Sequence, residues 1–423
     1  MADSKSAAQP LGCGPSMGFG DRIGLSTPGH IRALRESGLA GKVAPVFAQQ
    51  SVRENARTGR TPAEVMADAR RAVEAAGWSL AWGADADHLK TAQDLKPMAE
   101  AGFTFFTVDP SDYVNEAAAS MPADELDAAY RRLFSGAETP NGERLVAQYV
   151  ESGPRLLGDG RTLRIAREDL PRAALVYWKA IQHTIGLYRE AERLWQGERP
   201  FDFEMSVDET SAPTSHAAHY VIASELRQAG VRLTSLAPRF VGAFEKGIDY
   251  KGDLDPFEAH LEIHAAIARA LGPYKLSVHS GSDKFSIYPL LARYAGAALH
   301  LKTAGTSYLE ALRIPARRDP PLFRAIARLA VAHFGEARAS YHLSTDLARV
   351  PDPDQTADAD LERRFLQAPE ANDARQVLHV AYGDVLRHPA LGPALRRLVA
   401  ERAEEHAEDV ARHLARHLAA FKV

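Results

Sequence analysis

Short apolar stretches rich in β-forming residues recur along this chain, and each is followed by a longer segment with helical spacing. This alternation is the sequence pattern of parallel βα units, in which successive strands join one sheet and the helices cover it. Eight such stretches within about 300 residues predict a closed (β/α)8 barrel, or TIM barrel, and a doubly wound sheet is the alternative. The predicted strands are 43–47, 80–83, 103–108, 201–207, 233–236, 276–279, 298–302 and 340–343.

The remaining segments define the predicted domain organisation. Residues 1–40 contain the Gly- and Pro-rich stretch GCGPSMGFGDRIGLSTPGH, and we expect this segment to lack regular structure and to pack across one end of the barrel. Residues 41–350 form the predicted barrel. Between its third and fourth predicted strands, residues 110–200 indicate a helical insertion with an amphipathic helix from Arg172 to Trp195. Residues 351–423 predict a C-terminal helical extension.

Composition excludes several classes of partner. The 423 residues are 45% hydrophobic and 25% charged, which is typical of a globular protein. The 51 basic and 55 acidic residues are interspersed, so no charged surface for nucleic acid is expected. No apolar run approaches the roughly 20 residues that cross a bilayer, and the start MADSKSAAQPLG does not resemble a signal peptide. We therefore expect a cytoplasmic protein without a membrane partner, and homo-oligomerisation stays open.

The single cysteine, Cys13, excludes an intrachain disulfide and a zinc site built from several thiolates. The Gly-rich stretches GCGPSMGFG and HSGSDK are neither P-loops nor the G-x-G-x-x-G of a dinucleotide-binding fold, so no nucleotide cofactor is predicted. HSGSDKFS does place serines and a lysine at a strand end, an arrangement that suits an anionic substrate.

Polar side chains gather where the predicted strands end. In a TIM barrel the functional groups stand at the carboxyl ends of the strands, whereas polar residues elsewhere are usually structural or solvated. The strand-end candidates are Asp85, Asp87, His88, Asp109, Glu204, Ser206, Asp208, Glu209, Arg239, His279, Ser282, Asp283, Lys284, His300, Lys302 and His342. Glu204 is the most informative of them, because a carboxylate inside the apolar run FDFEMSV needs a cation, a metal or a catalytic task.

Histidines provide the evidence for a metal. His88, His279 and His300 at strand ends, together with carboxylates, match the ligand preferences of Zn²⁺, Mn²⁺, Co²⁺ or Ni²⁺. Other histidines are paired at helical spacing but lack the glutamate of an HExxH motif, so we expect them on solvated helix faces. These pairs are His260 with His264, His413 with His417, and His216 with His219.

Several long motifs resemble those of the tagaturonate epimerase family. They are FAQQSVRENARTGRTPAEVM, WGADADHLKT, FTVDPSDYV, FEMSVDET, SLAPRFVGAFEKGIDYKGDL, KLSVHSGSDKFSIYP and HLKTAGTSYLEALR, within about residues 17–345. The resemblance implies a metal-dependent barrel enzyme that interconverts D-tagaturonate and D-fructuronate, two sugar acids of hexuronate breakdown.

Residue roles follow from the same resemblance. It implies that Asp87 is the general base and Glu204 the paired acid. The implied metal ligands are His88, His279 and His300, although Asp208 or Glu245 could replace one of them. The substrate contacts are predicted from strand-end position instead, and they are Arg239, Ser282, Asp283, Lys284, Lys302, Asp208 and His342. Among them, Lys284, Arg239 or Lys302 would hold the substrate carboxylate. One geometric condition applies: His88 and His279 follow strands on opposite sides of the barrel, so they can share an ion only if their loops lean inward.

The chemistry points to carbon–carbon cleavage. The two sugar acids differ at a carbinol carbon β to the ketone, where the carbonyl does not acidify the C–H, so a metal-assisted retro-aldol and aldol sequence is expected. A metal-dependent aldolase or sugar isomerase on the same barrel is the alternative within enzymes. A non-catalytic sugar-acid binding protein is the alternative outside them, and it conflicts with so many polar groups placed at strand ends.

Overall fold

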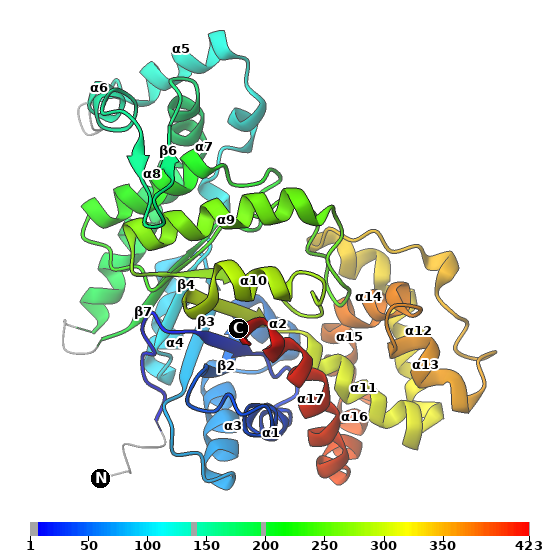
Figure 1. Cartoon of the computed structure of the whole chain (residues 1–423). Coiled ribbons are helices and arrows are strands. Elements are labelled where there is room, and N and C mark those ends of the chain that lie inside the picture. The colour runs from blue at the N-terminus through cyan, green and yellow to red at the C-terminus, as the bar shows by residue number, and fades with distance from the viewer. Residues whose placement is uncertain (1–6, 137–141, 196–199, 423) are drawn as a thin grey trace.

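Eight parallel strands close into a barrel at the centre of the molecule (Figure 1). The structure is a computed structural model, which describes residues 7–136, 142–195 and 200–422. The strands follow one another around the barrel in chain order, and the last pairs with the first. They are β1 (Ser16–Phe19), β2 (Ala44–Ser51), β3 (Gly83–Leu89), β4 (Phe105–Val108), β7 (Asp202–Ser206), β8 (Ser235–Ala237), β9 (Lys275–Val278) and β10 (Leu299–Thr303). The predicted TIM barrel is confirmed.

The first barrel strand was not predicted, and the last predicted strand, 340–343, was wrong. Ser16–Phe19, within the segment expected to be irregular, is strand β1 and pairs with β2 and β10. Gly18 in this strand leaves room for Gln49, because a Cβ at position 18 would lie 1.8 Å from the side-chain oxygen of Gln49. Residues 341–343 form no strand; they follow a short 3₁₀ helix and line a cavity at the barrel mouth. The strand count stays at eight because one error offsets the other.

Strand β3 begins where its prediction ended. The prediction stopped at Gly83, but GADADHL is itself the strand. Its alanines, Ala84 and Ala86, pack in the hydrophobic core, while Asp85 and Asp87 make polar contacts with Lys302. A strand with acidic residues on its inner face breaks the usual pattern of apolar inside and polar outside, which is why the composition of this segment concealed it.

Helices cover the outside of the barrel, and side-chain caps mark the starts of α2, α3, α4, α8 and α9. Ser51 at the end of β2 caps α2 in a capping box with Glu54, which aims the first turn of α2 at the barrel mouth. The covering helices are α1 (Thr27–Glu36), α2 (Val52–Thr58), α3 (Pro62–Ala75), α4 (Ala92–Ala101), α8 (His216–Gln228), α9 (Leu254–Leu271), α10 (Tyr288–Tyr294) and α11 (Thr306–Arg318).

The helical insertion lies between β4 and β7, as predicted, although β1 makes these the fourth and fifth barrel strands. It contains α5 (Ala123–Leu133), α6 (Gly142–Val146), a small antiparallel pair β5 (Arg155–Leu156) and β6 (Thr162–Leu163), and the long α7 (Asp169–Leu194). In Figure 1 it projects from one side of the barrel, far from the C-terminal helices. The predicted amphipathic helix corresponds to α7.

The C-terminal helices form a second layer beside the barrel (Figure 1). They are α12 (Pro320–Ala337), α13 (Leu361–Leu366), α14 (Asn372–Val380), α15 (Tyr382–Arg387), α16 (Leu391–Glu401) and α17 (Ala403–His417). A separate hydrophobic cluster joins α11 to α12–α16, so α12 packs with helices of the predicted extension 351–423. The last helix, α17, returns to pack on α1 and α11. Within the described ranges, no helix combines the length and apolarity needed to cross a membrane.

Candidate active site at the carboxyl end of the barrel

A buried lysine lies at the centre of an acidic cluster inside the barrel. The Lys302 Nζ is 2.8 Å from a carboxylate oxygen of Asp85, 2.8 Å from Asp87 and 3.0 Å from Glu204. All four side chains are buried. Burial alone would lower the pKa of Lys302, but the three carboxylates outweigh burial and raise it. One cation thus faces three carboxylates, which leaves this layer short of positive charge.

The carboxylates of this cluster differ in proton affinity. Burial, followed by repulsion from Asp87 and Glu204, raises the pKa of Asp85 to about 6 despite the nearby Lys302. For Asp87 and Glu204 burial acts in the same direction, but Lys302 and neighbouring histidines outweigh it and lower both pKa values. Groups whose environments separate their pKa values in this way are typical of acid–base sites.

Two histidines from opposite strands meet above the cluster. The rings of His88 and His279 lie edge to face with centroids 5.2 Å apart, so the geometric condition set by their opposite strands is met. His88 has a positive φ of 53°, a strained conformation for a non-glycine residue that places its ring over the barrel mouth. The His279 Nε2 lies 2.6 Å from Glu204 Oε1, and its Nδ1 lies 3.2 Å from Asp208 Oδ1.

The residues at this point fit a divalent cation. Ligand atoms of Asp87, His88 and His279 all lie within 4.8 Å of one another. This mixture of imidazole and carboxylate suits the borderline ions expected from the sequence. Glu204 behind His279 resembles the carboxylate that commonly orients a metal-bound histidine. Burial alone would lower the pKa of His88 and of His279, but the surrounding carboxylates raise them to about 10 and about 9. Both rings therefore lie where positive charge is stabilised.

His300 is not part of this group. Its Nδ1 lies 2.8 Å from the Ser16 hydroxyl oxygen, and its ring packs on Phe105 inside the barrel. Glu245, the alternative ligand, accepts hydrogen bonds from Gln376 and Ser344 instead. The structure thus brings together two of the three predicted histidine ligands.

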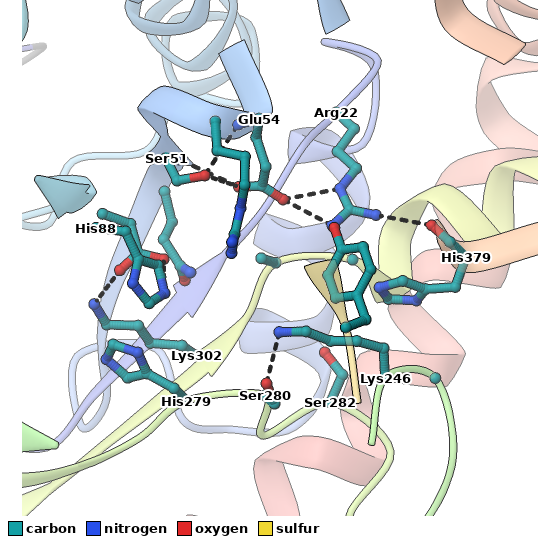
Figure 2. A pocket seen from close by; sticks show the side chains of 17 residues that line it. Arg22, Ser51, Glu54, His88, Lys246, His279, Ser280, Ser282, Lys302 and His379 are labelled. Atoms are coloured by element: carbon teal, nitrogen blue, oxygen red, sulfur yellow. Dashed lines mark hydrogen bonds and ion pairs between the residues drawn. The ribbon is translucent and has the colours of Figure 1, made fainter. Parts of the chain in front are cut away.

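Two adjoining cavities open beside the histidines, and Figure 2 shows the inner one. The inner cavity is lined by Asp87, His88, Lys302 and Ser282 among others. The outer cavity, of about 490 Å³, is lined on one side by three predicted substrate contacts, which are Asp208, Arg239 and His342. The residues that line both are Lys246, His279, Ser280 and Tyr341.

Cationic and neutral donors form the wall of the inner cavity away from the carboxylates. In Figure 2, Lys246 lies across the cavity from His88 and binds Ser280, with Nζ 2.6 Å from the hydroxyl oxygen. Across the described ranges, no carboxylate oxygen lies within ion-pair distance of the Lys246 Nζ. By contrast, Arg22 is paired with Glu54 at 2.8 Å. His379 is 2% exposed, and neither ring nitrogen has a hydrogen-bond partner. Lys246 and His379 are therefore available to an anionic ligand.

Two predicted substrate contacts lie elsewhere. Asp283 has a positive φ of 63° and its side chain points away from the cavities, toward Arg375 at 3.2 Å and His413 at 2.8 Å. The Lys284 ammonium donates to three backbone carbonyls, including that of Glu245 at 2.7 Å. Strand-end position placed both residues near the mouth, but the turn of the loop directs them into the protein.

Sequence reasoning missed several lining residues. Lys246 lies within the motif GAFEKGIDYKGDL, beyond the strand end that we searched. Arg22 follows β1, the strand that was not predicted. His379 comes from α14 in the C-terminal layer, and no sequence pattern places that helix beside the barrel mouth.

A parallel eight-stranded barrel with carboxylates, histidines and a lysine converging at its carboxyl end defines a (β/α)8-barrel enzyme. The chain belongs to the tagaturonate epimerase family, whose model matches residues 7–421. It is 45% identical over 390 residues to the tagaturonate/fructuronate epimerase of Thermotoga maritima, covering 92% of this chain and 77% of that protein.

Solved structures of fructuronate-tagaturonate epimerase UxaE from Cohnella laeviribosi are also similar. The native structure is 38% identical, with a TM-score of 0.90, and the match covers 99% of this chain and 83% of that chain. A structure with two glycerols is 37% identical, with a TM-score of 0.91, and covers 99% and 84%. The family assignment from sequence motifs is confirmed, and with it the enzyme class, an epimerase.

Proposed function

We propose that this enzyme interconverts D-tagaturonate and D-fructuronate by a metal-assisted retro-aldol and aldol sequence. The observation that carries the proposal is the convergence of Asp87, His88 and His279 on one point beside a cavity with a cationic opposite wall. Family membership supports the substrate pair, and the acid–base groups support the chemistry. The predicted cytoplasmic location and possible self-association stay predictions.

The reaction needs a base at the carbinol oxygen and a sink for two electrons. Removal of the hydroxyl proton turns the carbinol carbon into an aldehyde as the adjacent carbon–carbon bond breaks. The bonding electrons move toward the ketone and give an enediolate fragment. Rotation of the aldehyde by half a turn, reclosure of the bond and return of the proton to the new alkoxide give the epimer, so atoms and electrons balance without an external oxidant.

Asp87 is the proposed base because it lines the inner cavity and stays ionised beside Lys302. Glu204 does not line either cavity; its oxygen contacts His279 and Lys302, which do. A proton from the second face of the substrate would therefore reach Glu204 through one of those two groups. This arrangement keeps the predicted acid and base on two sides of the site, while only Asp87 touches the substrate directly.

His88 and His279, with Asp208 at 3.2 Å from His279 Nδ1, would hold the divalent cation and leave Asp87 free as the base. When bound, the cation supplies Lewis-acid stabilisation of the negative charge that develops on the ketone oxygen. Lys246 and His379 on the opposite wall would hold the substrate carboxylate, the role predicted for Lys284, Arg239 or Lys302. His300 stays a predicted ligand that the geometry does not favour.

The test is to incubate metal-stripped protein with D-fructuronate, alone and with Mn²⁺, Zn²⁺, Co²⁺ or Ni²⁺, and to resolve the products by NMR. We expect D-tagaturonate to appear only with metal. Net cleavage would instead indicate an aldolase, an aldose product an isomerase, and binding without turnover a sugar-acid binding protein. Deuterium at the carbinol carbon distinguishes mechanisms, since direct C–H abstraction predicts a primary isotope effect and loss of label.

A further inference from the structure

Four histidines gather between α8 and α9, outside both cavities. His216 and His219 come from the first turn of α8, and His260 and His264 come from α9. Their spacing predicted solvated helix faces, and that prediction was wrong. His219 and His264 are fully buried, and the other two are partly buried. Phe240, which lines the outer cavity, packs its ring edge-on against His264 at 5.6 Å between centroids.

Three of these rings converge on one point. The Nε2 atoms of His260 and His264 lie 3.2 Å apart, and each lies 3.1 Å from the carbonyl oxygen of Thr214. The His216 ring centroid is 4.9 Å from both of theirs. Ligand atoms of all three histidines lie within 4.8 Å of one another.

Protons alone explain this geometry poorly. If His260 and His264 both carry Nε2 protons, two donors share the Thr214 carbonyl while facing each other at 3.2 Å. A cation at the same point turns both lone pairs toward it. With Zn–N bonds of roughly 2.0–2.1 Å, two nitrogens of a tetrahedral site lie about 3.3 Å apart, close to the separation observed.

The surroundings supply the features of a metal-binding histidine site. His264 Nδ1 lies 2.7 Å from His219 Nδ1, and His219 Nε2 lies 2.8 Å from the hydroxyl of Tyr274. His219 can accept a hydrogen bond from the Nδ1–H of a metal-bound His264 and so fix the orientation of that ring, as the hydrogen-bond partners of metal-binding histidines commonly do.

We propose that His216, His260 and His264 bind a divalent cation of the zinc type, at a structural site separate from the active site. The Thr214 carbonyl or a water molecule fills the fourth position. A second buried group, Asp283 with His413 and His417, has comparable spacing but does not qualify, because the Arg375 guanidinium lies 3.2 Å from its carboxylate. In the cluster between α8 and α9, no positive group opposes the ion among the described residues.

The site would fasten the outer cavity wall to the helices. Thr214 and Arg239 are joined by two hydrogen bonds, from the Thr214 N–H to the Arg239 carbonyl and from the Arg239 N–H to the Thr214 hydroxyl, both at 2.9 Å. A cation held by α9 and the start of α8 therefore fixes the loop that carries Arg239 and Phe240. We expect it to affect thermal stability more than the chemical step.

The test measures zinc in untagged protein that has been stripped with a chelator, loaded with ZnCl₂ and desalted. His260→Gln is the main variant, and His216→Ala is the second, because His216 is partly exposed and its Nε2 donates to a backbone carbonyl, that of His260. His88→Gln removes a ligand of the proposed active-site ion, and His183→Gln, on α7, is the matched control. Circular dichroism verifies that each variant is folded.

We expect each cluster variant to hold one zinc equivalent fewer than wild type, and to lose the rise in Tm that zinc gives wild type. His183→Gln should retain the full amount. His88→Gln should lose a different equivalent, so failure of the active-site proposal would leave the difference between wild type and His260→Gln unchanged. Equal zinc content and an equal Tm response in wild type and both folded cluster variants would overturn the inference.

Discussion

The loop after β9 joins two buried polar clusters that differ in charge balance. His279 belongs to the active-site cluster, where Lys302 is the cation among Asp85, Asp87 and Glu204. Asp283, four residues later, belongs to the cluster beside α17, where Arg375 and His413 flank the carboxylate. The first cluster lines a cavity and places three carboxylates around one lysine, whereas the second is closed and pairs its carboxylate with Arg375 and His413.

The charge balance suggests that the cluster around Lys302 serves catalysis and that the cluster around Asp283 stabilises the fold. An acidic cluster with too few cations is held in place by the fold and gains from a bound cation or substrate. The Asp283 cluster instead ties three layers together, since Arg375 also donates to the carbonyls of Gly247 and Leu366. Removing a carboxylate should therefore have opposite consequences in the two clusters.

The largest expected effect is on turnover in Asp87→Asn. Loss of the proposed base should lower kcat by about 10²–10⁴-fold, the usual contribution of general acid–base catalysis. The fold should not be weakened, because Lys302 keeps Asp85 and Glu204 and the excess of carboxylates falls. Steady-state kinetics and urea unfolding measure the two effects. Asp112→Asn, an exposed carboxylate paired with Lys90, is the control and should match wild type in both.

An Asp87→Asn enzyme with kcat within about tenfold of wild type would contradict the role of base. A folded variant that loses both activity and several kcal/mol of stability would contradict the comparison itself, because Asp87 would then resemble Asp283.

Asp283→Asn should have the reverse outcome. Leaving the buried Arg375 without its carboxylate should lower the free energy of unfolding by about 3–5 kcal/mol. Protein that is still folded should keep kcat within a few-fold of wild type. Urea unfolding measures the stability, and Asp346→Asn, whose side chain is about half exposed, is the control with an expected change within about 0.5 kcal/mol. A loss below about 1 kcal/mol would show that this ion pair is not a main source of stability.

These two clusters also show what could be predicted from sequence. Alternating strands and helices gave the barrel, and the rule that strand ends carry function found Asp87, His88 and His279. The rule failed at Asp283 because the backbone there, and at Ser280, has positive φ and turns successive side chains in different directions. Sequence spacing contains no such information. Other lining residues reach the cavity only through long-range packing. His379 is the example: it comes from α14 (Asn372–Val380), whereas the last barrel strand, β10, ends at Thr303.

Strand β1 was missed in the sequence for a different reason. Four residues with a central glycine are too few for a β pattern to exceed that of a turn, and only closure of the barrel by β2 and β10 makes them a strand. The histidines of α8 and α9 show the same limit, since each pair has ordinary helical spacing and only the packing of the two helices brings them together.

A smaller effect should distinguish the two lysines assigned to the substrate carboxylate. Lys246→Met should raise KM by about tenfold, equivalent to roughly 1.4 kcal/mol of binding, with a smaller change in kcat. Lys284→Met should instead lower stability, because three backbone carbonyls lose their donor. Lys251→Met, a half-exposed residue on the same loop, is the control. An unchanged KM in Lys246→Met would remove Lys246 from the binding site.

The smallest expected effect is the pH dependence of the Asp283 contribution. Burial alone would raise the pKa of this carboxyl, but Arg375 and His413 outweigh burial and hold the pKa well below its usual value. A carboxyl with a lowered folded-state pKa stabilises the fold above its unfolded value of about 3.9 and loses that contribution as the pH falls toward the folded value. The difference in unfolding free energy between wild type and Asp283→Asn should therefore be constant from about pH 7 to about pH 5 and shrink below about pH 4. Urea unfolding of both proteins across that range measures it. A difference that stays constant at low pH would mean that Asp283 contributes through packing rather than charge, and the contrast with the active-site cluster would then rest on shape alone.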